Sequence, residues 1–160
     1  NPVRRGEPLY INSDMFLGGH GGECYRNYQI APVAPHQEKM WRVVADSAEI
    51  MVEGCRPGRA CCDVARDVHA FQVKEGMRDY IYHRPGHGIG MNHEGHQMPC
   101  LSLGDDTPIE AGMMFSVEPG LYDTARGIGI NPSDTILVTD KGGVLMSRLP
   151  FGREWSFLTL

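Results

Sequence analysis

The sequence lacks three features, and each absence argues against a class of protein. No apolar run approaches the roughly 20 residues that a membrane-spanning helix needs, and no signal-like hydrophobic stretch opens the chain. No run of basic residues is present, and the formal net charge is −5, which does not suit a nucleic-acid partner. There is also no Cys-x-x-Cys pair. We therefore expect neither a membrane nor a nucleic acid as partner.

The five cysteines are odd in number, and two of them, Cys61 and Cys62, are adjacent within a helical pattern. This arrangement favours reduced, packed thiols over disulfides, so we expect a soluble, cytoplasmic protein. A length of 160 residues is enough to bury one core, which predicts a single domain over residues 1–160. The chain starts at Asn1 and reaches a strand-like run within ten residues, which we interpret as a cut, processed or partial chain.

Hydrophobic patterning predicts a strand pair, a helix pair and then a β-rich part. Strands are expected at 9–16 and 24–30, helices at 36–53 and 60–75, and short strands at 80–83, 113–117, 135–139 and 144–146. The glycine-rich segment 17–22 joins the first two strands, and Gly76 is the stop signal of the second helix. This order predicts an α+β layer, in which helices cover one face of a curved antiparallel sheet and the other face can host a site.

A polar site is indicated by two segments about thirty residues apart. His87 lies between two glycines, so the backbone can turn sharply there and present the imidazole. Glu118 ends the apolar run 113–117, where a buried carboxylate would need a partner, although a surface position at the strand end remains open. Together they predict a small polar site for hydrolytic chemistry.

Two other interpretations of the histidine-rich segment are less favoured. A phosphate-binding loop would need a helix after the glycines of 86–90, and none is predicted. A zinc-binding helix would need histidines at positions i and i+4, whereas His93 and His96 have the wrong spacing and Gly95 and Pro99 oppose a helix.

Motifs along nearly the whole chain resemble one superfamily. Residues 83–150 contain "HRPGHGIGMNHEGHQMP", "IEAGMMFSVEPGLY" and "SDTILVTDKGGVLM", preceded by "YINSDMFLGGHGGECYRNYQIAP" and "VEGCRPGRACCDVARDV". These segments resemble the C-terminal part of the pita-bread (M24) superfamily of aminopeptidase P, prolidase, creatinase and methionine aminopeptidase. "HEGHQMP" and "VEPGLY" are most similar to the Xaa-Pro peptidases. The resemblance implies a pita-bread fold and a hydrolase.

Metal-dependent members of that superfamily hold two divalent ions with two Asp, one His and two Glu. The resemblance places these positions at Asn12, Glu23, His87, Glu118 and Ser133. Two dications a few ångströms apart repel by on the order of tens of kcal/mol at low dielectric, and about two carboxylates remain here to offset that. A dinuclear centre is therefore not expected. One ion (Mn, Co, Zn or Fe) on Glu23, His87 and Glu118 remains open, and a shift of one residue near 131–134, or Asp14 in place of Asn12, would restore part of a metal site.

The creatinase-like members imply an alternative without metal or other cofactor, which the sequence favours modestly. In this interpretation His87 transfers the proton, since the ordinary pKa of histidine, about 6.5, lies near the working pH. Glu23 and Glu118 would hold a guanidinium or amidine group, and His93 would polarise the bond to be cleaved. The catalytic residues would then be His87, His93, Glu118 and Glu23, with substrate binding assigned to His83, His96 and Arg26.

The expected function is hydrolysis of a C–N bond in a small amide, amidine or peptide. One alternative is a metal-dependent Xaa-Pro aminopeptidase or dipeptidase, and another is a catalytically silent binding module. The resemblance also implies that the N-terminal half of the superfamily domain is missing. We expect another polypeptide, a cleaved upstream segment or a homo-oligomer to cover the apolar surface that this leaves.

Overall fold

A computed structural model describes residues 2–91 and 96–159 of the chain. The elements are β1 (Pro8–Ile11), β2 (Asp14–Leu17), β3 (His20–Glu23), β4 (Arg26–Ile30), α1 (Pro35–Gly54), α2 (Cys61–Lys74), the 3-10 helix η1 (Arg78–Tyr80), β5 (Met114–Ser116), β6 (Leu121–Asp123), β7 (Ile128–Ile130), β8 (Thr135–Thr139), β9 (Gly142–Leu145), α3 (Arg153–Ser156) and β10 (Phe157–Leu158). No helix in the described ranges is long and apolar enough to cross a membrane.

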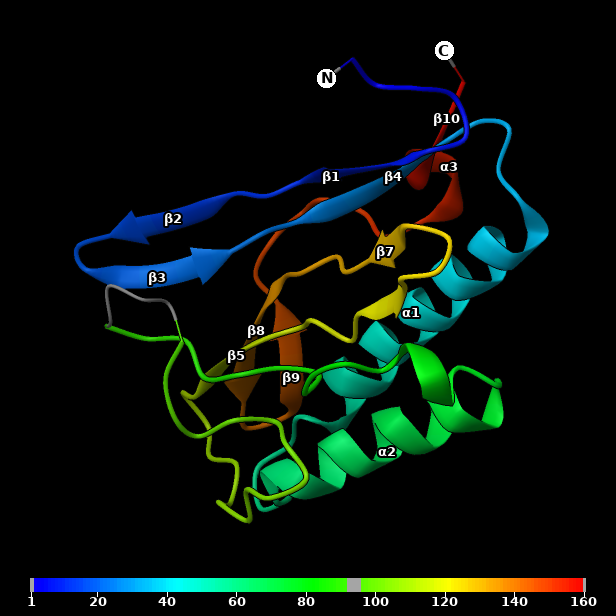
Figure 1. Cartoon of the computed structure of the whole chain (residues 1–160). Helices are drawn as coiled ribbons and strands as arrows, with labels where there is room; N and C mark the ends of the chain where they lie inside the picture. Colours follow the sequence, from blue (N-terminus) through cyan, green and yellow to red (C-terminus); the bar gives the residue numbers. More distant parts are fainter. Residues whose placement is uncertain (1, 92–95, 160) are drawn as a thin grey trace.

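The N-terminal strands form a long ribbon that reaches over the rest of the molecule (Figure 1). β1 pairs antiparallel with β4, and β2 pairs antiparallel with β3. The ribbon turns at Gly18 and Gly19, whose φ angles of 60° and 87° match the twist of a two-residue hairpin turn. The predicted hairpin is confirmed, and its register sets Asp14 opposite Glu23.

Both predicted helices are confirmed within two residues at each end. α1 begins at Pro35, where a missing amide hydrogen costs nothing because the first turn has no acceptor for it. In Figure 1 the two helices lie together on one side of the β5–β8–β9 sheet. The buried cluster between these layers consists of Ala48, Met51, Cys55, Cys61, Val64, Val68, Leu101, Ile109, Phe115, Val117, Ile136 and Val138. The helices thus cover one face, as predicted, and leave the polar site on the other.

The strands differ in detail from the single curved antiparallel sheet that the sequence predicted. They form four small sheets, and β10 runs parallel to β4. The prediction of a strand at 80–83 is wrong, because the chain forms η1 and then an irregular segment there. Tyr82 and His83 meet Tyr122 through their side chains there, while the backbone of β6 pairs with β7 instead.

The glycines around His87 are required by close packing. A Cβ on Gly88 would lie 2.7 Å from the carbonyl oxygen of Gln97 and 2.8 Å from that of Pro99. Gly88 also bridges to Phe115, so three segments meet at this position without room for a side chain. The sequence analysis explained the glycines beside His87 by a sharp turn. In the structure, Gly88 is required because three backbone segments approach one another closely.

Gly88→Ala should destabilise the protein by about 1–3 kcal/mol or more, since the methyl group meets backbone atoms that cannot rotate away. Gly104→Ala is the matched control, because nothing lies within 4 Å of its added Cβ and its φ is not positive. Urea denaturation of both variants measures the difference. Equal stability of the two would contradict the packing explanation.

Candidate active site

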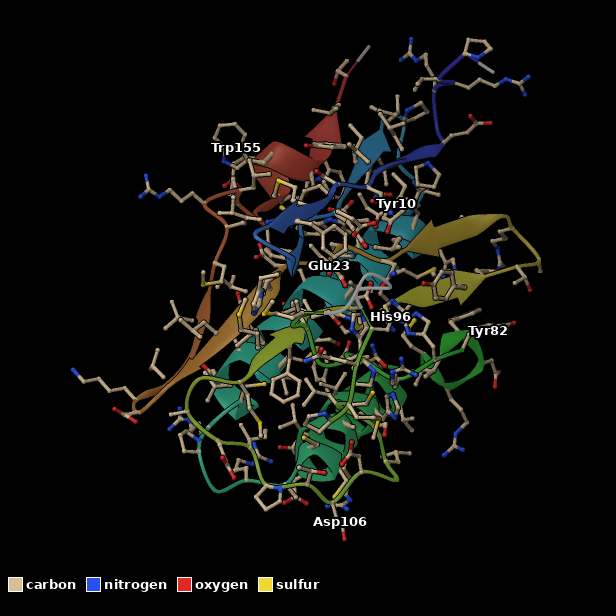
Figure 2. The ribbon with its side chains drawn as sticks, turned by 90° about the vertical axis from the view of Figure 1, so that its left-hand side faces the viewer. Tyr10, Glu23, Tyr82, His96, Asp106 and Trp155 are labelled. Atoms are coloured by element: carbon tan, nitrogen blue, oxygen red, sulfur yellow. The ribbon has the colours of Figure 1, made fainter. Side chains whose placement is uncertain are left out.

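Three acidic and basic side chains from separate segments meet above the β5–β8–β9 sheet. Nε2 of His87 lies 3.2 Å from Oε1 of Glu23 and 3.2 Å from Oε2 of Glu118. Glu23 comes from the end of β3 and Glu118 from the segment after β5. The side chains of His87 and Glu23 are buried and that of Glu118 is mostly buried, so the mutual attraction is only weakly screened. Figure 2 shows Glu23 at the centre of the molecule, with His96 next to it.

Neighbouring hydroxyl groups hold the two carboxylates in place. Ser133 donates its hydroxyl proton to Oε2 of Glu23 at 3.0 Å, and Ser116 donates to Oε2 of Glu118 at 3.4 Å. Ser116 also accepts the backbone N–H of His87 at 3.0 Å, which links the histidine to the same support. Each carboxylate therefore has one neutral donor in addition to the imidazole.

The ring of His87 is oriented by its other nitrogen. Nδ1 lies 3.0 Å from the carbonyl oxygen of Gly88, which can only accept, so Nδ1 carries a proton. Nε2 is consequently the atom turned toward the carboxylates. Although both oxygens are at ion-pair distance, Nε2 makes no hydrogen bond of good geometry and is fully buried. A buried nitrogen that lies between two carboxylates and lacks a well-formed hydrogen bond is a suitable position for a bound ligand.

The pKa values of the cluster follow from these contacts. Burial alone would lower the pKa of His87, but the adjacent Glu118 and Glu23 carboxylates outweigh it and raise the pKa to about 10. For Glu118, burial would raise the pKa, whereas His87, with smaller contributions from His83 and His96, lowers it. In the absence of a further ligand the cluster therefore stabilises an imidazolium between two carboxylates.

The donor atoms fit one divalent ion. Ligand atoms of Glu23, His87 and His96 all lie within 4.8 Å of one another, and the rings of His87 and His96 stack at 3.8 Å. Glu118 adds a second carboxylate at the same nitrogen. The other two positions of the two-ion arrangement offer no charge, since Ser133 is a buried hydroxyl and Asn12 is exposed. Asp14, the alternative to Asn12, faces Glu23 across the hairpin but is exposed and accepts the hydroxyl of Tyr25, so these residues suit one ion better than two.

The remaining predicted site residues lie in different surroundings. His83 is at the rim, where its Nδ1 donates to the carbonyl oxygen of Arg84 at 2.6 Å and its Nε2 accepts the hydroxyl of Tyr122 at 2.9 Å. His96 is exposed and stacks on His87. His93 lies outside the described residues. The substrate-binding roles of His83 and His96 stay predictions.

Arg26, predicted to bind substrate, is buried in a structural network. Its guanidinium forms a 2.8 Å ion pair with Asp134, whose side chain is fully buried. It also donates to backbone oxygens of Tyr25, Ser133, Leu149 and Pro150 and to the hydroxyl of Ser147, and it stacks on the ring of Phe151 at 4.0 Å. With its N–H groups engaged, this side chain holds the ribbon to the sheet, and the geometry does not favour contact with a substrate.

Sequence reasoning missed the tyrosines around the cluster. Burial, Glu118 and further groups raise the pKa of Tyr10 above its usual range, and burial and Glu118 raise that of Tyr122 to about 12. Tyr25 donates its hydroxyl proton to Oδ1 of Asp14. The predicted hairpin was a signal for Tyr10 and Tyr25, which lie on the ribbon, whereas Tyr122 belongs to β6, which the sequence did not indicate.

Comparison with known proteins identifies the family. The sequence profile of metallopeptidase family M24 matches residues 1–140, so the chain belongs to this family. The putative dipeptidase YkvY of Bacillus subtilis is 28% identical over 148 residues, which is 92% of this chain and 40% of that protein. The prolidase of Pyrococcus horikoshii OT3 superposes with a TM-score of 0.88 at 23% identity, covering 94% of this chain and 42% of that one.

The fold is therefore the pita-bread fold of these peptidases, as the resemblance predicted. The N-terminal domain of the FACT complex subunit SPT16 from chickpea has the same fold, with a TM-score of 0.87, 15% identity and coverage of 98% of this chain and 39% of that one. This chain spans about 40% of the length of the relatives it matches. Fold and family are thus established, whereas activity, substrate and partners of the whole protein are proposals.

Arg26→Met should destabilise the protein by about 3–5 kcal/mol, because it leaves Asp134 as an uncompensated buried charge. The control is Arg148→Met, at an exposed arginine, which should change stability by no more than about 0.5 kcal/mol. Chemical denaturation measures both. Unchanged stability of Arg26→Met, combined with a raised KM for substrate, would show that Arg26 is a binding residue after all.

Metal-depleted protein should lose stability as the pH rises from about 6.5 to about 10. The pKa of His87 is higher in the folded state than its ordinary value, so its favourable contribution is complete below pH 6.5 and disappears as the pH passes about 10. Urea denaturation in EDTA, compared with His87→Gln, isolates this contribution. His20→Gln is the control and should keep the profile of the parent, and an identical profile for His87→Gln would refute the assignment.

Proposed function

We propose that this chain carries the active site of an M24 hydrolase that cleaves the C–N bond of a short peptide or small amide. The observation that supports it is the convergence of Glu23 and Glu118 on Nε2 of His87 at 3.2 Å each. The named functions of relatives, a putative dipeptidase and a prolidase, favour a peptide over an amidine substrate. The chain spans about 40% of the length of those proteins, so the activity of the whole protein is part of this proposal.

The cluster is proposed to hold one divalent ion, with Glu23, His87 and Glu118 as ligands and His96 at hand. A bound Mn, Co, Zn or Fe ion would supply Lewis-acid polarisation of the carbonyl and an activated water. The protein supplies the orientation: Ser133 and Ser116 fix the carboxylates, and the carbonyl oxygen of Gly88 fixes the imidazole tautomer.

Two features of the surroundings prepare the site for a substrate. His83 is held at the rim by hydrogen bonds at both ring nitrogens, one with the carbonyl oxygen of Arg84 and one with the hydroxyl of Tyr122. Tyr25 is buried and Tyr122 half-buried near Glu118, which excludes part of the water, whereas Tyr10 is 43% exposed at the outer edge of this group.

The metal-free mechanism is the second candidate. It predicts that peptide hydrolysis persists in EDTA, whereas the single-ion mechanism predicts that it is lost. Its support is the His87 position itself, between two carboxylates that balance an imidazolium without any ion. The binding-module alternative is supported by the SPT16 domain, which has this fold in a protein named as a complex subunit.

The purified protein should bind one equivalent of divalent metal, and Glu118→Gln should weaken that binding at least tenfold, because a charged ligand is lost. Elemental analysis and competition with a fluorescent chelator measure this. Glu110→Gln, at an exposed glutamate away from the cluster, is the control with the same charge change. Two equivalents of metal would contradict the single-ion site, and peptide hydrolysis that persists in EDTA but is lost in His87→Ala would establish the metal-free mechanism.

A further inference from the structure

A surface cavity that shares no residue with the His87 cluster lies where α3 packs against β4. Its volume is about 410 Å³, and it is lined by Tyr28 of β4, the segment 148–150 and Trp155 of α3. Arg26 and Ser156 complete the lining from positions that are themselves buried. The volume is in the range of binding pockets, roughly 300–1,000 Å³.

The walls of this cavity are fixed in the free protein. Arg26 donates hydrogen bonds to the carbonyl oxygens of Leu149, at 2.6 Å, and Pro150, at 3.3 Å. α3 is held in place because β10, which follows it directly, pairs with β4. Ser156, at the end of α3, is buried. A cavity with preformed walls loses little conformational entropy when it binds a partner.

Trp155 is an exposed aromatic side chain at the border of this cavity. It is 60% exposed, and within residues 2–91 and 96–159 its ring contacts no other ring and donates no hydrogen bond. Figure 2 shows it at the edge of the molecule with its ring turned outward. A lone exposed apolar residue would need no explanation. Here Tyr28 and Arg148 line the same cavity, and tryptophan, tyrosine and arginine are the residues enriched at interface hot spots.

The charge in the cavity indicates the chemistry of the partner. Arg26 is balanced by Asp134 in a 2.8 Å ion pair. Arg148 is exposed and forms no ion pair with any residue that the structure describes. The cavity therefore carries one unbalanced positive charge, in a chain whose formal net charge is −5. A carboxylate matches the guanidinium, and an apolar side chain beside that carboxylate matches Trp155 and Tyr28.

We propose that this cavity docks a segment of another protein in which an aspartate or glutamate follows an aromatic or aliphatic residue. The apolar side chain lies against Trp155 and Tyr28, and the carboxylate pairs with Arg148. A nucleic acid is disfavoured, because one free arginine on an acidic chain does not hold a run of phosphates. A small carboxylic acid is disfavoured, because such ligands are held in sites that bury most of their surface, whereas Trp155 is largely open to water.

The test is an NMR titration of the 160-residue protein with the peptide Ac-Ala-Phe-Asp-Ala-NH2. The comparison probe is Ac-Ala-Phe-Asn-Ala-NH2, which has nearly the same shape and no charge. The charged peptide should bind about two- to fivefold more tightly, as expected for an exposed ion pair. The indole N–H resonance that is absent from Trp155→Ala should shift during the titration, because that ring lies in the contact.

Two variants separate the apolar contact from the charge. Trp155→Ala should weaken both peptides at least about tenfold. Arg148→Gln should remove the preference for the charged peptide and leave the neutral one unchanged. Tyr82→Ala is the matched control for the tryptophan, since Tyr82 is 61% exposed and lies on the opposite side of the molecule in Figure 2. Arg78→Gln, at an exposed arginine that does not line the cavity, is the control for the charge.

Equal affinity for the two peptides, or a preference that survives in Arg148→Gln, would overturn the proposal. This holds even where Trp155→Ala fails to fold, because Arg148 is exposed and its side chain supports no described contact. Binding of phenylacetate as tight as that of the charged peptide would assign the cavity to a small carboxylate instead. Self-association in sedimentation experiments that Trp155→Ala abolishes would assign it to a second copy of this chain, and would likewise overturn the proposal. No measurement here requires turnover, so the result is independent of the proposed function.

Discussion

The buried ion pair between Arg26 and Asp134 joins the N-terminal ribbon to the sheet that carries the rest of the site. Arg26 belongs to β4 and Asp134 directly precedes β8, so a contact between residues 108 apart sets the ribbon on the sheet. The paired backbone bonds between Tyr25 and Ser133 lie next to it. Glu23 is two residues before Tyr25, and its distance from His87 therefore depends on this junction. Without this ion pair, Glu23 on the ribbon would have no fixed position relative to His87.

The charges at the site limit what it can hold. Glu23 and Glu118 supply two negative charges, which one dication balances and two dications exceed. Ser133, at a position where the resemblance expects a carboxylate, donates a proton to Glu23 instead of competing for an ion. A hydroxyl in this place also avoids a third carboxylate in the cluster of Glu23 and Glu118, which would need a further cation. The hydroxyl of Ser133, in place of a charged carboxylate, is thus compatible with a stable protein that binds no second metal ion.

Much of the fold was predictable because it depends on local patterns. Helical spacing and stop signals predicted α1 and α2, and the glycine-rich segment predicted the hairpin. β6 and β7, of three residues each, were missed because such short strands have no detectable alternation. The irregular segment at 81–83 was predicted to be a strand because tyrosine and isoleucine favour strands, yet it contacts β6 through the side chains of Tyr82 and His83 and not through backbone pairing.

The site was less predictable, since its contacts join distant parts of the chain. The resemblance singled out His87, Glu23 and Glu118, and the structure brings their atoms together, while their catalytic roles stay predictions. The partner of Arg26 was not readable from the sequence, because nothing local in either segment pairs it with Asp134. The grouping of Tyr10, Tyr25 and Tyr122 likewise follows from the ribbon register, the bridge between Tyr25 and Ser133, and the position of β6.

The fold alone does not decide between an enzyme and a binding module, because a prolidase and a domain of a protein named as a complex subunit share it. The buried cluster does bear on that choice. Removing a carboxylate from water costs several kcal/mol, and a structural role could be met by apolar residues of similar volume. Glu23 and Glu118 are held by Ser133 and Ser116 around Nε2 of His87, which lies 3.2 Å from both carboxylates without a hydrogen bond of good geometry. In the apoprotein the imidazolium of His87 offsets part of the cost of burying these charges, and a bound cation would take over that role. The cluster is therefore best explained by a molecule or ion that it binds during its function.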